Sequence, residues 1–230
     1  MRVGIVFAMK SEQDAFLSYF PNVSLQALPY GEGFIFEAGK HTIVGLLAGV
    51  GKVNAAMHTT RLFENESIDV LFNVGVAGGI HLNPGQLIVA QKVLYHDVDV
   101  RSFGYPLGML PGQSGPFNCS HLWNQRLQAA ANRQSLDWVE GILGSGDQFV
   151  TSLDDLNLMR AEYPNLKAID MEAAAIAHVA QSYRCEFVAI RTISDRIGEV
   201  SQIADFNRFV YESALKAGSL MVEVLTAHDA

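Results

Sequence analysis

The stretch VLFNVGVAGG, residues 70–79, gives the clearest indication of the fold. The run from Val70 to Val76 is mostly apolar on both faces, which is typical of a strand buried inside a sheet. Gly75, Gly78 and Gly79 end the stretch, where the backbone could turn tightly into a helix or approach a flat ring or a sugar. A strand buried on both faces needs helices on both sides of its sheet, so this stretch indicates an α/β protein.

Strand and helix patterns alternate on either side of this stretch. Short apolar runs predict strands over Val3–Ala8, Gly33–Glu37, Thr42–Ala48, Val70–Val76, Leu87–Tyr95, Ile142–Val150, Ala168–Met171 and Phe187–Ile193. Helical patterns lie between them, over Ser11–Phe20, Lys52–Asn65, Leu122–Gln134, Leu153–Tyr163, Glu172–Tyr183 and Ala204–Thr226. Neither an internal repeat nor a proline-rich linker interrupts the alternation. We therefore expect one domain, residues 1–230, with a central sheet covered by helices.

The composition favours a small-molecule ligand. The 230 residues include 16 Lys and Arg against 24 Asp and Glu, which gives a formal net charge of −8. Because nucleic acids and anionic membranes attract basic surfaces, neither is expected as a partner. The apolar run at the N-terminus stops at Lys10, too short for a signal peptide or a membrane span, and Cys119 and Cys185 lie in unrelated contexts. We therefore expect a cytoplasmic protein without a disulfide framework.

One long segment shows no secondary-structure period. Residues Asp97 to Ser120, DVDVRSFGYPLGMLPGQSGPFNCS, mix glycine, proline and aromatic residues. About two dozen irregular residues are unusual inside a compact domain, and such segments are more often functional than not. We expect this one to act as a lid or as an arm at an interface.

Acidic side chains lie close to the ends of several predicted strands. Ligands of open α/β sheets bind outside the carboxyl ends of the strands, and Glu12, Glu172 and Asp195 all fall there. Glu12 and Glu172 fall in the first turn of a predicted helix, where the helix dipole favours an ionised proton acceptor. Asp195 ends the apolar run FVAIRTISD, where burial would raise its pKa and make it a proton donor. Taken singly, each acid could instead be a helix cap or part of a surface salt bridge.

Two further patterns are weaker. Gly49 and Gly51 imitate the start of a dinucleotide-binding fingerprint, but Asn54 stands where its third glycine belongs, and a P-loop is absent. His96 and Asp97 have the residue types of a metal site, yet neighbouring residues of an extended segment point in opposite directions. For these residues we favour hydrogen bonding over metal binding.

Seven short segments carry a resemblance to a known family. They are GIVFAMKSE, AGVGKVNAA, NVGVAGG, YHDVDVRSFGY with LPG, GSGDQFV, IDMEAAAIAHVA and IRTISD, in this order along nearly the whole chain. With them the chain resembles the 5′-methylthioadenosine/S-adenosylhomocysteine nucleosidases, which have the nucleoside phosphorylase fold. The resemblance implies a single-domain, three-layer α/β/α sandwich with a mixed central sheet.

The resemblance also implies a role for each matching residue. Glu12 would activate the attacking water, Asp195 would protonate N7 of adenine, and Glu172 would accept from the ribose hydroxyls, with Arg191 near the water and these acids. The remaining contacts to the base, the ribose and the 5′ group would come from Met9, Val50, Gly78, Phe149, Val150, Met171 and Ser194. In the family a homodimer partner completes the 5′ pocket, here with Phe103, Tyr105 and Pro111.

The implied reaction is hydrolysis of the N-glycosidic bond of methylthioadenosine, S-adenosylhomocysteine and 5′-deoxyadenosine. Adenine is a poor leaving group unless it receives a proton at N7, and water is a poor nucleophile unless a base accepts its proton. Each proton transfer is worth about 10²–10⁴-fold in rate. Neither a metal nor an organic cofactor is needed for these steps.

Alternatives remain open at this point. A phosphorylase of the same fold needs cationic groups for phosphate, and only Lys10 stands in a suitable place. A hydrolase of 6-amino-6-deoxyfutalosine would use the same base and ribose contacts, a non-catalytic nucleoside-binding module would lack turnover, and a nicotinamide dehydrogenase would rest on the two glycines alone. The chain also departs from the family at Val76, where serine is usual, and at Asp170, where glutamate is common.

Overall fold

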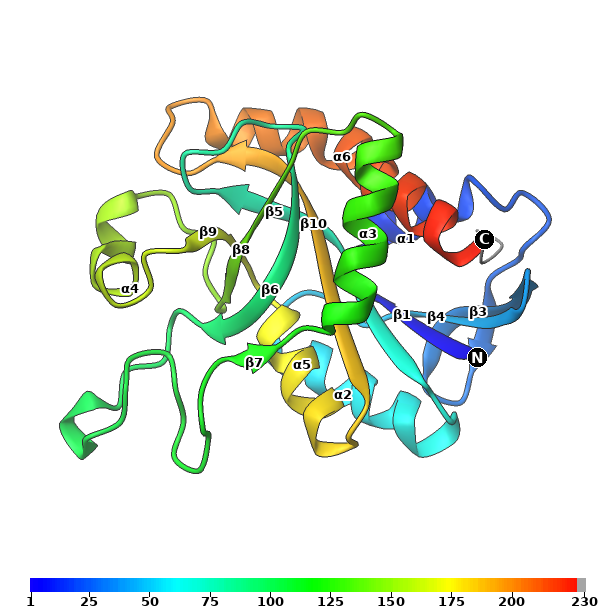
Figure 1. Ribbon diagram of the computed structural model, residues 1–230, viewed down its shortest axis with the longest axis horizontal. Coiled ribbons are helices and arrows are strands. Elements are labelled where there is room, and N and C mark those ends of the chain that lie inside the picture. Colours follow the sequence, from blue (N-terminus) through cyan, green and yellow to red (C-terminus); the bar gives the residue numbers. More distant parts are fainter. Residues whose placement is uncertain (227–230) are drawn as a thin grey trace.

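A computed structural model describes residues 1–226. Within this range ten strands form one mixed sheet (Figure 1). The strands are β1 (Arg2–Phe7), β2 (Gln26–Leu28), β3 (Gly31–Ala38), β4 (His41–Leu47), β5 (Val70–Gly79), β6 (Leu87–Tyr95), β7 (Phe117–Asn118), β8 (Trp138–Ser145), β9 (Leu166–Asp170) and β10 (Glu186–Arg196). The α-helices are α1 (Lys10–Leu17), α2 (Lys52–Asn65), α3 (His121–Arg133), α4 (Asn157–Glu162), α5 (Ala173–Ser182) and α6 (Gln202–Thr226).

Part of the sheet closes on itself. Strand β5 runs parallel to β1 and β10 and pairs antiparallel with β9 at Gly78 and Gly79. From β10 the pairing continues through β6 and β8 back to β9, so that five strands form a ring. On the other side of β5, strands β1, β4, β3 and β2 extend the sheet as an open edge. The ring brings the carboxyl ends of β5, β9 and β10 close together.

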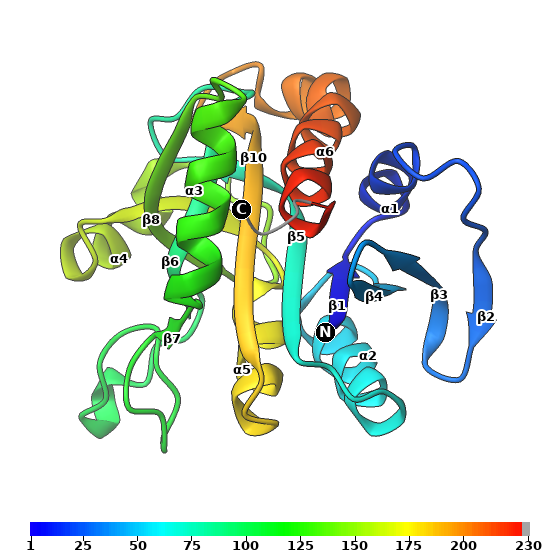
Figure 2. The ribbon, with the colours of Figure 1, turned by 45° about the vertical axis from the view of Figure 1, so that its right-hand side comes forward.

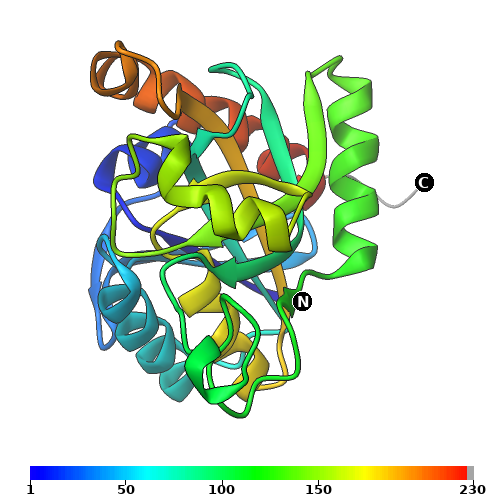
Figure 3. The ribbon, with the colours of Figure 1, turned by 90° about the vertical axis from the view of Figure 1, so that its left-hand side faces the viewer.

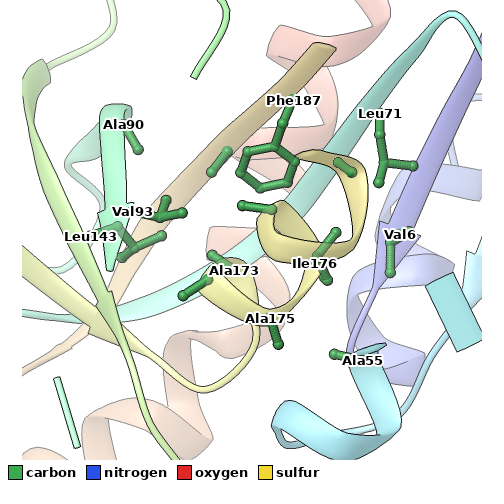
Figure 4. Packing of buried hydrophobic residues seen from close by; sticks show 14 of the residues in the cluster. Val6, Ala55, Leu71, Ala90, Val93, Leu143, Ala173, Ala175, Ile176 and Phe187 are labelled. Carbon is green, nitrogen blue, oxygen red and sulfur yellow. The ribbon is translucent and has the colours of Figure 1, made fainter. Parts of the chain in front are cut away.

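Helices cover both faces of the sheet, as the apolar strands require. Figures 1 and 2 show α6 beside α1, with α3 along β10 and β6, and these helices bury Phe16, Trp123 and Met221 in one core. On the opposite face, α2 and α5 pack against Val6, Leu71 and their neighbours in a second core (Figure 4). The prediction of an α/β sandwich with a covered, mixed central sheet is confirmed.

Several elements begin or end at other residues than their apolar patterns predict. Gly75, Gly78 and Gly79 do not form a turn, because β5 continues to Gly79. The strand expected over Ile142–Val150 begins earlier and ends at Ser145, and the helix expected over Leu153–Tyr163 is a 3₁₀ turn at Leu153–Leu156 followed by α4. Local apolar patterns do not mark these ends, which depend on pairing with distant strands.

The long segment from Asp97 to Ser120 is largely irregular, as expected. It contains a 3₁₀ turn at Arg101–Phe103 and the two-residue strand β7. Figure 1 shows this green segment as an arm that extends away from the sheet, Figure 3 shows it from its outer side, and Phe103 is 79% exposed. Among the described residues, 1–226, no helix is long and apolar enough to cross a bilayer.

Candidate active site

A cavity of about 220 Å³ lies at the carboxyl ends of β1, β5, β9 and β10. Its walls come from separate parts of the chain that the fold brings together. The lining residues are Ala8, Met9, Glu12, Val50, Val76, Ala77, Gly78, Gln148, Phe149, Val150, Ile169, Asp170, Met171, Glu172, Ser194, Asp195, Ile197, Gln202 and Phe206. The three predicted acids therefore line one cavity.

Glu12 lies in the first turn of α1, as predicted, and backbone groups hold its carboxyl group. Oε2 accepts hydrogen bonds from the N–H groups of Ala8 at 3.0 Å and Met9 at 2.9 Å, and Oε1 accepts one from Val76 at 3.0 Å. A Cβ atom at Gly75 would lie 2.3 Å from Oε1, so only glycine leaves room there. Because Glu12 also caps its own helix, the simpler interpretation of this acid as a cap is correct too.

Opposing effects act on the protonation of Glu12. Burial raises the pKa of its carboxyl group above the ordinary value, while the positive charge of Arg191 and the three N–H groups lower it. Three fixed donors around one carboxyl group favour its ionised form. Glu12 is thus a buried acceptor with a fixed orientation, which suits a general base.

Asp195 is held by side chains. It follows a bulge in β10, and its Oδ1 accepts a hydrogen bond from Ser194 Oγ at 2.6 Å, while Oδ2 accepts one from Gln202 Nε2 at 2.8 Å. A Cβ atom at Gly78 would lie 3.3 Å from Oδ2. Burial raises the pKa of Asp195, as expected, and the two hydrogen bonds oppose this effect.

Arg191 lies behind the cavity wall. Its guanidinium group donates to the backbone oxygen of Asn73 at 2.8 Å and to Asp170 Oδ2 at 2.5 Å, and it also bonds the side chain of Asn73. Asp170 accepts further hydrogen bonds from Ser145 Oγ and from the N–H of Ala173. The shorter acid at position 170 therefore completes a buried ion pair, and Arg191 acts on the cavity through its charge.

Glu172 was expected to be ionised, but its surroundings favour the protonated form. It is the N-cap residue of α5, just before the first turn, and its Oε1 accepts a hydrogen bond from the N–H of Gly51 at 2.8 Å. Gly51 adopts a φ of 95°, which directs this N–H toward the acid. Burial, followed by the charge of Asp170, raises the pKa of Glu172 to about 8. The helix dipole therefore does not keep this carboxyl group ionised in the free protein at neutral pH.

The cavity contains most of the predicted site residues. Those that line it are Met9, Glu12, Val50, Gly78, Phe149, Val150, Met171, Glu172, Ser194 and Asp195. Arg191 does not line it, and neither do the arm residues Phe103, Tyr105 and Pro111. Sequence reasoning missed Gln202 and Phe206 because they lie in the first turns of the last helix, where a glutamine and a phenylalanine form no distinctive pattern.

Asp97, one of the two residues considered for metal binding, has other partners. Asp97 accepts from Lys52 Nζ at 2.5 Å and from the N–H of Asp147 at 3.0 Å, which agrees with the hydrogen-bonding interpretation. His96 is buried and burial lowers its pKa. Within residues 1–226 no group of three or more His, Cys, Asp or Glu side chains is arranged to hold a metal ion.

Known proteins share both the sequence pattern and the fold. A family model described as the phosphorylase superfamily matches residues 2–226. A 5′-methylthioadenosine/S-adenosylhomocysteine nucleosidase of Bacillus cytotoxicus is 33% identical over 98% of each chain. The crystal structure of the corresponding nucleosidase from Neisseria meningitidis, in complex with methylthio-immucillin-A, has a TM-score of 0.91 and 28% identity over 98% of each chain. A futalosine hydrolase of Helicobacter pylori has a TM-score of 0.90 and 27% identity over 97% of each chain.

These similarities, together with the cavity, define the class of protein. The chain belongs to the phosphorylase superfamily and, within it, to the family of the 5′-methylthioadenosine/S-adenosylhomocysteine nucleosidases. It is therefore an N-glycosyl hydrolase, as the resemblance of its sequence implied.

Proposed function

We propose that the chain hydrolyses the N-glycosidic bond of methylthioadenosine and S-adenosylhomocysteine, and also of 5′-deoxyadenosine. The products are adenine and the 5-thioribose or 5-deoxyribose. The observation that carries the proposal is that Glu12 and Asp195 line the same cavity but are stabilised by different groups. One acid suits proton acceptance from water, and the other suits proton donation to a leaving base.

The purine base binds at the Asp195 end of the cavity. The ring of Phe149 offers a stacking surface, the backbone of Val150 and Gly78 approaches the base edge, and Ser194 orients Asp195 through its hydrogen bond of 2.6 Å. A protonated Asp195 gives its proton to N7 as the bond to the sugar breaks. The electron pair of the C–N bond then stays on a neutral purine.

The ribose and the water bind between Asp195 and Glu12. Glu12 accepts a proton from water as its oxygen adds to the sugar carbon, and Glu172 with Met171 positions the ribose. Arg191, from behind the wall, stabilises the ionised form of Glu12. The acidic lining also suits the positive charge that develops on the sugar in the transition state.

Two features favour water over phosphate as the acceptor. Among the residues that the structure describes, no lysine or arginine lines the cavity, whereas Glu12, Asp170, Glu172 and Asp195 do. Lys10, the one cation considered for phosphate, lies outside it and pairs with Asp14 at 2.5 Å. A phosphate dianion would meet acids without a compensating charge, which is unfavourable.

The 5′ group is the least constrained part of the substrate. Val50 and Phe149 are about half exposed at the cavity, so the 5′ end is open in the single chain. We propose that a homodimer partner closes it with Phe103, Tyr105 and Pro111 of the arm. Removing the Phe103 ring should then raise KM for thioethers and leave kcat nearly unchanged, with dimer formation checked by analytical ultracentrifugation.

A second substrate is supported by one comparison. The futalosine hydrolase of Helicobacter pylori has the same fold at 27% identity, and an open 5′ end could accept the larger 5′ group of 6-amino-6-deoxyfutalosine. Base and ribose contacts would be shared between the two substrates. A panel of both substrates at equal concentration separates the two functions by kcat/KM.

The direct test is incubation of the purified chain with methylthioadenosine in phosphate-free buffer. We expect free adenine and methylthioribose, with a rate that does not rise when phosphate is added. Formation of a ribose-1-phosphate on adding phosphate would show phosphorolysis. Tight nucleoside binding without adenine release would show a binding module, and either result would refute the proposal.

A further inference from the structure

Gln202 connects Val150 and Asp195 at the Asp195 end of the cavity, where the base is proposed to bind. It is the first residue of α6, and its side chain is buried. Nε2 donates to the backbone oxygen of Val150 at 2.9 Å and to Asp195 Oδ2 at 2.8 Å. Its Oε1 accepts from the N–H of Gly198 at 3.1 Å. All the hydrogen-bonding capacity of the amide nitrogen is thus used on two acceptors of the cavity wall.

Adenine would need the same two acceptors. Along one edge of its ring, adenine presents N7 as an acceptor and the 6-amino group as a donor of two hydrogens. If Asp195 serves N7, the adjacent amino group faces the Asp195 carboxyl group and the Val150 backbone. The amide NH₂ of Gln202 is also a planar group with two hydrogens, and it already bridges these acceptors. A nitrogen that donates to both oxygens must lie between them, where Gln202 Nε2 already lies at 2.9 Å and 2.8 Å, so the base and this side chain compete for one position.

We propose that Gln202 is a specificity-determining residue that stands in for the 6-amino group of the base and must release Val150 and Asp195 before an adenine base can bind. This inference rests on the proposed function. It explains how two buried acceptors avoid the cost of lacking donors in the free protein. Adenine replaces the two donated bonds one for one, whereas a base with a 6-oxo group brings an acceptor and leaves both unsatisfied.

The surroundings of Gln202 allow this release. Its side chain is anchored at Oε1 by Gly198, which has a φ of 87° in the turn between β10 and α6. Val200, in the same turn, is fully exposed, so no other part of the described chain covers the turn at this point. Gln202 also precedes Phe206 by one helical turn, and Phe206 packs edge-on against Phe149 at 5.6 Å between ring centroids.

Asp195 is the titrating group that Gln202 contacts. In the free protein the hydrogen bond that Gln202 donates to Oδ2 favours the ionised form of Asp195, so a side chain without donors at position 202 raises the pKa of this carboxyl group. When adenine takes the place of Gln202, its N7 accepts a hydrogen bond only from the protonated carboxyl group. Ser194 of β10 acts in the same direction as Gln202, while burial and Asp205 of α6 act in the opposite one. From β5, Gly78 contributes only backbone. Binding of the base and protonation of Asp195 therefore favour one another.

The test uses Gln202→Met, which keeps the length of the side chain and removes its donors. Adenine should bind roughly tenfold more tightly by isothermal titration calorimetry, because no internal donor competes with it. The basic limb of kcat/KM for methylthioadenosine should move upward by about one pH unit. Gln91→Met is the matched control, because Gln91 also donates to a carboxylate, that of Glu140, but lies outside the cavity. It should change neither quantity.

The outcomes separate this role from the proposed function. If the native chain binds adenine and Gln202→Met binds it no more tightly, the role of Gln202 is wrong and the nucleosidase assignment stands. If neither chain releases adenine from methylthioadenosine, the proposed function is wrong, and the role of Gln202 with it. Should Gln202→Met fail to fold in a thermal scan, Gln202→Asn replaces it, since an amide one methylene shorter cannot span both acceptors and carries the same expectation.

Discussion

The two ends of the cavity hold their acids in different ways. At one end, three backbone N–H groups fix Glu12, and they belong to the segment after β1 and to β5 itself. At the other end, two side chains hold Asp195. The N–H of Val76 cannot move without disturbing β5, and those of Ala8 and Met9 are fixed in the backbone that joins β1 to α1, whereas a hydroxyl and an amide side chain can rotate away. The difference indicates a rigid end for activating water and an adaptable end that exchanges its partners for the base.

The largest effects should come from removing the acids themselves. We expect Glu12→Gln and Asp195→Asn each to lower kcat by about 10²–10⁴-fold, since each removes one proton transfer. Adenine affinity should distinguish them: unchanged in Glu12→Gln, and about tenfold weaker in Asp195→Asn, which disturbs the base contacts. Steady-state kinetics and calorimetry measure the two quantities. Full activity of Asp195→Asn would refute its role as the acid.

The next largest effects should come from replacing two glycines of β5, which compares how firmly Glu12 and Asp195 are held. In Gly75→Ala the new Cβ would lie 2.3 Å from Glu12 Oε1, and the backbone donors prevent the carboxyl group from moving aside. We expect a loss of about 1–3 kcal/mol in unfolding free energy and a large loss of kcat. In Gly78→Ala the corresponding contact with Asp195 Oδ2 is 3.3 Å, so the change should be milder and fall mainly on KM. Urea titration of both variants makes the comparison, and equal destabilisation would contradict it.

Features of the fold and the site that depend on short stretches of chain could be predicted from the sequence. Glu12 and Asp195 could be identified because Glu12 follows an apolar strand and Asp195 lies near the end of another, and such strand ends meet at one edge of an α/β sheet. The cover of helices on both faces also follows from strands that are apolar on both sides. These features depend on short stretches of chain, so their residues alone indicate them.

Other features depend on contacts between distant segments. The closure of the sheet requires β5 to pair with β9 and β10, and no local pattern in Val70–Gly79 specifies those partners. Gly75 and Gly78 leave room for the carboxyl groups of Glu12 and Asp195, and this role is visible only once the structure places those acids opposite them. Gln202 is one of many glutamines until the turn after β10 places it beside Asp195.

Glu172 lies between the two ends and gives a pH-dependent prediction. Its pKa of about 8 in the folded protein exceeds the ordinary value, so the stability it contributes is complete below about pH 4.5 and is lost as the pH rises toward 8. Glu172→Gln removes this loss. Relative to the native chain, the variant should gain on the order of 4 kcal/mol in unfolding free energy between about pH 5 and about pH 9. Urea titrations at the two pH values measure this gain, and a parallel pH dependence would contradict the prediction.

The smallest effect should come from Val76→Ser, which restores the residue usual in the family. Val76 holds Glu12 through its backbone N–H, and that hydrogen bond does not depend on the side chain. The rigid end should therefore survive, with a stability loss of about 1 kcal/mol for the apolar atoms removed. Because the new hydroxyl only adds a contact near the sugar, we expect kcat/KM for methylthioadenosine to change by about tenfold or less. A gain of many orders of magnitude would mean that the side chain of Val76, and not the placement of Glu12 and Asp195, determines the activity of this cavity.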